Sequence, residues 1–282
     1  MVRPIILHFH IFKNAGQTLD WTLEKNFRES FVLHSYQDPP GPLSLEKVLE
    51  YFKNNENLVA FSSHRIRFPI PESNLVNIIP IFFVRNPIDR AGSIYHFVKN
   101  KNSNDSLETI AAKKLDLKEF ILWSFKNSKK QIENQQVRFI SQNHFRPMFS
   151  KFSTACKYSK KSLCGIVERF DDSMVVIEEN LKKKFKNIDL SYKAQNVNIK
   201  RKKSLAEKLE EIEGEIGKNL FHELQKKNEF DQKLCSFVNE QLEQKIKLIK
   251  DFDSKLENYK QRCKDLEKGN SKNEFEKTIF HS

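Results

Sequence analysis

The sequence predicts an α/β fold in which a P-loop-like parallel sheet is flanked by helices, followed by a C-terminal helical extension. Residues 5–12 and 78–84 are almost continuously apolar, as buried parallel strands are. Each runs into a polar turn and then into a helix pattern, and a strand–turn–helix gathers backbone N–H groups around one point. With 282 residues, 38% of them hydrophobic, the chain can form one large α/β domain with an appendage.

The first strand–turn–helix covers residues 5–18 and has a lysine, Lys13, in its turn. The sequence of this turn does not match the Walker motif, because Lys13 precedes Gly16 instead of following a second glycine. The apolar spacing after the turn predicts a helix to about Arg28. His8 and His10 share one face of the strand, and we interpret them as residues that pack in the sheet.

Further elements follow in order. Residues 31–34 and 58–62 are predicted strands, the second running into Ser63 and His64, and a helix is predicted between them from an N-cap at Ser44. After strand 78–84, Asn86 is a good N-cap and Pro87 suits the first helical position. Ser93 returns to the Asn86 side two turns later. Arg85 lies at the carboxyl end of this strand, where open α/β sheets bind ligands.

The remaining pattern divides the chain into a core, residues 1–204, helices that pack on the core, residues 205–245, and an extension, residues 246–282. Within the core we predict helices at about 107–114, 117–128 and 131–142, a late strand at 162–167, a helix at 171–185 and a basic loop at 193–204.

The C-terminal pattern allows two interpretations. From Cys235 to Leu266, apolar residues recur in alternating three- and four-residue steps, interrupted only at Lys245. A run of this length predicts a coiled coil, through which a homodimer could form, or a single long amphipathic helix that lies on the core.

Charge and cysteine content narrow the function classes. The net charge of +12 favours an anionic partner or merely aids solubility. The four cysteines form no C-x-x-C pair, which argues against zinc, and Cys156 and Cys164 are either free thiols or the two ends of a small disulfide-closed hairpin. No signal peptide and no 18-residue apolar run are visible, so we expect a cytoplasmic protein without a transmembrane segment.

Two anion sites at one sheet edge suit a nucleotide with phosphates at both ends of its ribose. The pair resembles the carbohydrate sulfotransferases that use 3′-phosphoadenosine 5′-phosphosulfate (PAPS), the family that includes heparan sulfate 2-O-sulfotransferase and its bacterial relatives. Their first loop reads like HIPKTGGTTL, and residues 10–19 here are HIFKNAGQTL. Their second reads like FVR[DN]P[VI][ED]RxxSxY, and residues 83–95 are FVRNPIDRAGSIY. Weaker similarities at residues 133–139, 165–171, 192–198 and 228–234 extend the resemblance over about residues 5–245.

The resemblance implies PAPS as donor, a hydroxyl acceptor on a carbohydrate, no metal and no nucleic acid partner. It assigns Lys13 to the 5′-phosphosulfate as a leaving-group residue, and Arg85 and Ser93 to the 3′-phosphate. The turn around Lys13 would cradle the 5′-phosphate, and the basic loop would fold over the nucleotide; the residues concerned are Asn14, Ala15, Gly16, Gln17 and Thr18 in the turn and Lys200 and Arg201 in the loop. Phe12, Asn14, Ala15 and Gln17 depart from the family pattern.

His64 is the candidate general base for the acceptor hydroxyl. It follows strand 58–62 and should emerge at the same sheet edge, and an imidazole has a suitable pKa for proton transfer. Two other functions stay open. One is a nucleotide-dependent kinase, which the missing Walker order disfavours. The other is a non-catalytic scaffold that holds a polyanion in its groove and recruits partners through the coiled coil.

Overall fold

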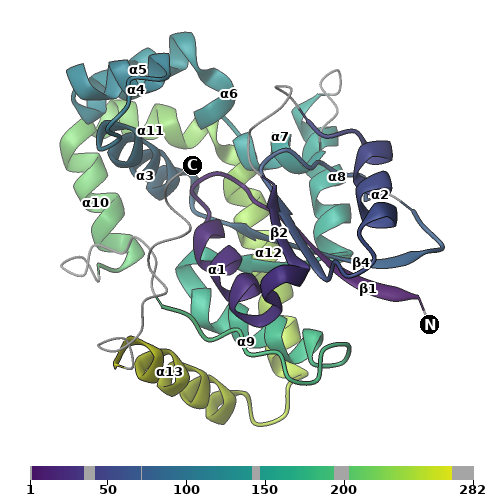
Figure 1. Cartoon of the computed structure of the whole chain (residues 1–282). Coiled ribbons are helices and arrows are strands. Elements are labelled where there is room, and N and C mark those ends of the chain that lie inside the picture. Colours follow the sequence, from purple (N-terminus) through teal and green to yellow (C-terminus); the bar gives the residue numbers. More distant parts are fainter. Residues whose placement is uncertain (1, 35–41, 71, 142–146, 194–202, 269–282) are drawn as a thin grey trace.

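The computed structural model describes residues 2–34, 42–70, 72–141, 147–193 and 203–268 (Figure 1). Its centre is a sheet of five parallel strands, in the order β2-β3-β1-β4-β5. The strands are β1 (Arg3–Phe9), β2 (Phe31–His34), β3 (Ala60–Ser63), β4 (Val76–Val84) and β5 (Leu163–Ile166). The predicted parallel sheet is confirmed, and all five predicted strands are present.

Helices cover both faces of the sheet (Figure 1). One face of β1, with Ile5 and Leu7, packs into a core completed by α2 (Leu45–Asn54), α7 (Gln135–Ser141), α8 (Met148–Lys160) and α12 (Glu229–Lys247). The other face, with Ile6, packs against α1 (Gly16–Phe27), α9 (Phe170–Leu181) and α13 (Phe252–Lys268). Since both faces are buried, the strands need the continuous apolar runs that predicted them.

A separate group of helices lies beyond the carboxyl ends of the strands (Figure 1). A second hydrophobic cluster holds it together, with Ile94, Phe120 and Leu224 among its buried members. The helices are α3 (Pro87–Lys99), α4 (Leu107–Lys114), α5 (Leu117–Asn127), α6 (Lys129–Ile132), α10 (Leu205–Ile216) and α11 (Lys218–Lys227). This group closes over the sheet edge where the site was predicted.

The structure differs from the predicted helices at two places in the middle of the chain. The predicted helix 131–142 is two short helices, α6 and α7, because Asn134 adopts a left-handed backbone conformation, φ 47°, between them. Helix α8 was not predicted, because its apolar stripe is narrow and polar residues such as Lys151 and Ser159 are buried on it.

The C-terminal pattern from Cys235 to Leu266 belongs to two helices, α12 and α13, separated by a turn in which Asp251 has φ 56°. Its apolar positions are buried within the chain: Val238 of α12 in the first core, and Tyr259 of α13 in the second. The amphipathic alternative therefore describes the packing, although as two helices instead of one. No helix among the described residues is long and apolar enough to cross a lipid bilayer.

Candidate functional site

A cavity of about 520 Å³ lies at the carboxyl edge of the sheet, between the turn after β1 and helices α3 and α10. Most of the predicted site residues line it: Lys13, Ala15, Gly16, Gln17, Thr18, His64, Arg85 and Ser93. Lys200 and Arg201 lie outside the described residues. The structure thus brings together two segments about 70 residues apart in sequence, as the parallel order of β1 and β4 requires.

The turn after β1 is a backbone cradle. Lys13 and Ala15 have positive φ angles, 65° and 59°, which turn the chain sharply into α1. Helix α1 begins at Gly16 without a side-chain cap, and its first residues line the cavity, so the partial positive charge of the helix N-terminus lies at the cavity wall. This arrangement fits the phosphate that the predicted 5′ site would bind.

Lys13 is held at the cavity wall in an apolar and cationic setting. Its ammonium lies 4.1 Å from the ring centroid of Phe97. Burial first, and then the charges of Arg85 and Arg90, lower the pKa of Lys13 to about 8. An anion placed between these cations would relieve their repulsion, which is the electrostatic signature of an anion site.

Arg85 contacts both loops of the predicted anion sites, which are the turn after β1 and the turn between β4 and α3. We call these two turns the anion loops. Its Nε donates to Asp89 Oδ2 at 2.8 Å, and its Nη1 donates to the carbonyl oxygen of Lys13 at 3.0 Å. The salt bridge to Asp89 therefore exists, and Arg85 still lines the cavity beside it. Ser93 lies two turns into α3, half-buried on the same wall.

Asn14 differs from the rest of the predicted set. Its side chain is buried beneath the turn, where Nδ2 donates to the carbonyl oxygen of Phe83 at 2.8 Å and to Gln136 Oε1 at 2.7 Å. Asn14 therefore secures the turn from below instead of lining the cavity.

His64 lies directly after β3 and packs on a second imidazole. Its ring centroid is 3.8 Å from that of His10. His64 Nδ1 lies 2.7 Å from the carbonyl oxygen of His10, so Nδ1 carries the proton and donates, and Nε2 has the lone pair. Burial first, and then His10, lower the pKa of His64 to about 3, so the ring is neutral and is a weaker base than a free imidazole.

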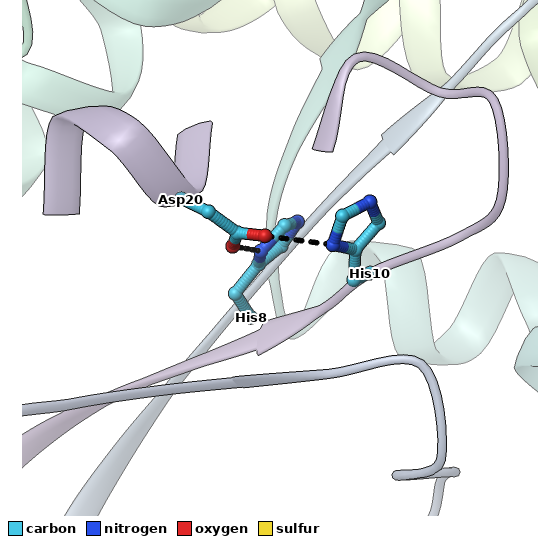
Figure 2. Close-up of side chains that lie close together, drawn as sticks. All are labelled: His8, His10 and Asp20. Atoms are coloured by element: carbon cyan, nitrogen blue, oxygen red, sulfur yellow. Dashed lines mark hydrogen bonds and ion pairs between the residues drawn. The ribbon is translucent and has the colours of Figure 1, made fainter. Parts of the chain in front are cut away.

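A buried carboxylate joins two histidines behind this wall (Figure 2). Asp20 Oδ1 lies 2.7 Å from His8 Nδ1, and Asp20 Oδ2 lies 2.8 Å from His10 Nδ1. Despite its burial, Asp20 has a lowered pKa because His10 and His8 stabilise its charge. His8 is fully buried and its pKa is lowered by that burial, whereas His10 reaches the cavity.

His10 has one role that the sequence did not predict. It packs in the sheet as expected, but its ring also abuts the cradle: a Cβ on Gly16 would lie 2.2 Å from its Cδ2 and Nε2. Asp20 was missed as well. The available signal was an acidic residue beside the buried Leu19 and Leu23 of α1, because a buried acid implies a partner.

The same three residues could hold a metal ion, since their ligand atoms all lie within 4.8 Å of one another. However, separations of 2.7 and 2.8 Å between nitrogen and oxygen are hydrogen-bond lengths. We therefore interpret Asp20 as a clamp that orients both imidazoles. The cysteines are free thiols, and Cys156 is not paired with Cys164.

Comparison with known proteins agrees with this geometry. Residues 3–238 match the sulfotransferase family. A protein of Archaeoglobus fulgidus, described as uncharacterized, is 32% identical over 245 residues, which cover 84% of this chain and 97% of that protein. The matched span includes both anion loops, residues His8, His10 and His64, and helix α7. The chain therefore belongs to the sulfotransferase family, and it is a PAPS-dependent transferase.

Proposed function

We propose that the chain transfers the sulfuryl group of PAPS in line to a hydroxyl group, and that this hydroxyl group belongs to a carbohydrate. The observation that carries this proposal is the shared cavity: two loops suited to phosphate and a neutral, buried imidazole line the same wall. The donor, when bound, supplies the sulfuryl group and leaves as adenosine 3′,5′-bisphosphate.

The residues of the chain can meet the two electrostatic demands of such a transfer. Negative charge builds on the departing phosphate, by analogy with phosphoryl transfer. Lys13 and the first N–H groups of α1 would stabilise that charge without reorganising, because both are already held in place. Arg85 and Ser93 would hold the 3′-phosphate on the α3 side of the cavity.

The acceptor hydroxyl must also lose its proton, for which His64 is our proposed base. Its Nε2 is the nitrogen able to accept, since Nδ1 donates to His10. His10 is a second candidate, because it lies in the same cavity and Asp20 orients its ring. In either case a positioned imidazole contributes about 10²–10⁴-fold to the rate.

Adenosine 3′,5′-bisphosphate tests the nucleotide assignment. We expect it to raise the melting temperature without Mg²⁺, because a ligand that binds only the native state stabilises it. Stabilisation by ATP with Mg²⁺, but not by the bisphosphate, would favour the kinase. A melting temperature that neither nucleotide changes would favour the polyanion-binding scaffold.

Transfer of labelled sulfate from PAPS to a panel of glycans, lipid-linked sugars and small hydroxyl compounds tests the acceptor. Variants His64→Ala and His10→Ala identify the base. The variant that lacks the base should keep its affinity for the bisphosphate and lose turnover. Turnover that survives in both variants would exclude both imidazoles.

Four further expectations stay predictions. They are a cytoplasmic location, a role for Lys200 and Arg201 over the nucleotide, a homodimer through the C-terminal helix, and the domain boundaries at residues 204 and 245. Sedimentation of the purified chain would test the homodimer, and a Lys200→Ala/Arg201→Ala variant would test the loop through its affinity for the bisphosphate.

A further inference from the structure

One buried amide, the side chain of Gln136, contacts both anion loops at once. Its Oε1 accepts from Asn14 Nδ2 at 2.7 Å and from the backbone N–H of Arg85 at 2.8 Å. Its Nε2 donates to the carbonyl oxygen of Arg85 at 2.8 Å. Gln136 is fully buried and does not line the cavity, so it cannot touch a ligand there.

A buried carboxylate on α12 fixes the place of Gln136. Asp231 accepts from the backbone N–H of Gln136 at 3.0 Å and from that of Val137 at 2.8 Å. Its Oδ2 is also 3.3 Å from Gln136 Nε2. The start of helix α7 is therefore anchored by its backbone as well as by the side chain that reaches the loops.

Two asparagines complete the anchor between α7 and α12. Asn134 Oδ1 accepts from the backbone N–H of Asp231 at 3.0 Å, and Asn228 Oδ1 accepts from the backbone N–H of Asn134 at 2.9 Å. We call Asn134, Gln136, Asn228 and Asp231 the bridging network. All four are buried, and unmade hydrogen bonds in such a place are unfavourable, so the network has one low-energy arrangement.

We propose that Gln136 is a positioning residue that sets the spacing between the two phosphate sites through its own side-chain contacts with both loops. The proposal rests on the proposed function, because it concerns a donor with phosphates at two ends. The loop of Lys13 and the loop of Arg85 come from different strands, and each meets the same amide within hydrogen-bond distance. A ligand held at both ends depends on that spacing, whereas a ligand held at one end does not.

Binding of three nucleotides by titration calorimetry tests this spacing. Adenosine 3′,5′-bisphosphate uses both sites, while adenosine 5′-monophosphate and adenosine 3′-monophosphate use one each. We expect Gln136→Ala to weaken the binding of the bisphosphate by about tenfold or more, which is about 1.4 kcal/mol. The binding of each monophosphate should weaken by less than about threefold. In turnover, the same variant should raise KM for PAPS more than it lowers kcat.

Asn228→Ala is the matched control. It removes a buried side-chain amide of the same network that touches neither loop. We expect a lower melting temperature with bisphosphate affinity within about twofold of wild type, since a lost buried hydrogen bond destabilises the fold. Measurements are made well below the melting temperature of each variant.

Gln136→Glu keeps the size and shape of the side chain, and it is the second variant to measure if Gln136→Ala does not fold. When protonated, its carboxyl group can still donate to the carbonyl oxygen of Arg85; when ionised, it opposes Asp231 at close range. The bisphosphate affinity of this variant should therefore fall as pH rises, more steeply than that of wild type.

Equal losses for all three nucleotides in Gln136→Ala, or an equal loss in Asn228→Ala, would overturn the positioning role alone. A Gln136→Glu variant whose bisphosphate affinity follows the wild-type pH profile would also overturn it. Failure of the wild-type chain to bind the bisphosphate would instead overturn the proposed function, and this inference with it.

Discussion

Replacing Gly16 by alanine should disrupt the cradle through a single added methyl group. Gly16 is the first residue of α1, and its φ angle is not positive, so the glycine is required for space and not for backbone conformation. A Cβ at this position would lie 2.2 Å from Cδ2 and Nε2 of His10, far inside contact distance. Either the His10 ring or the start of α1 must move.

The His10 ring has little freedom to move. Its Nδ1 lies 2.8 Å from Asp20, and its ring centroid lies 3.8 Å from that of His64 and 5.1 Å from that of His8. Overpacking of this kind destabilises a protein by about 1–3 kcal/mol, and a rigidly held neighbour places the value near about 3. Alanine is favoured over glycine in a helix by at most about 1 kcal/mol. The net expectation is a loss of about 2 kcal/mol in the free energy of unfolding, with weaker binding of the bisphosphate.

Urea unfolding and calorimetry measure these two effects. Gly214→Ala is the matched control, because Gly214 lies in α10 with nothing within 4 Å of the added methyl group. It should stabilise the chain by up to about 1 kcal/mol. Adding His10→Ala to Gly16→Ala should cost less than the sum of the two single changes, since the clash is removed. A Gly16→Ala variant with wild-type stability and wild-type affinity would refute the steric reasoning.

Three further outcomes follow from the structure. Affinity for the bisphosphate should fall as pH rises through about 8, because Lys13 then loses its proton in the free protein, and Lys13→Arg should remove this pH dependence. Tyr259→Phe should destabilise the chain by about 1–3 kcal/mol in urea unfolding, because the carbonyl oxygen of Leu190 loses a buried donor at 2.9 Å. Cys164, buried and with a pKa raised by that burial to about 12, should react with a thiol reagent only on unfolding, whereas half-buried Cys156 should react in the native state.

Each of these outcomes has a clear contrary result. A pH-independent affinity in wild type would show that Lys13 does not hold the anion. A Tyr259→Phe variant as stable as wild type would show that the hydrogen bond from Tyr259 to Leu190 does not stabilise the fold. Reaction of Cys164 at the rate of Cys156 in the native protein would contradict its burial.

The parts of the fold that were predicted correctly depend on local sequence. Strands β1 and β4 are continuous apolar runs, and the Asn86 side chain caps α3 as predicted, accepting from Ile88 N–H at 2.9 Å. Because the strands are parallel, their carboxyl ends meet at one edge, and this placed Lys13, Arg85 and His64 around one cavity.

The parts that were missed depend on contacts distant in sequence. The break at Asn134 needs Asn228 and Asp231, more than 90 residues later, to accept from the freed backbone N–H groups of Asn134, Gln136 and Val137. The orientation of His10 depends on Asp20 across the gap between strand and helix, which no periodicity reveals. The turn before α13 contains no glycine or proline, so the apolar spacing gave no sign that the helix ends there.

Helix α13 lies beyond the span matched by the family, residues 3–238, yet it supports the cavity. Tyr259 packs in the core and holds Leu190, and Cys263 Sγ accepts from the backbone N–H of Tyr192, whose ring lines the cavity. During synthesis, this wall is secured only after α13 has left the ribosome. A nascent chain that already contains both anion loops therefore still lacks the contacts by which α13 supports this wall.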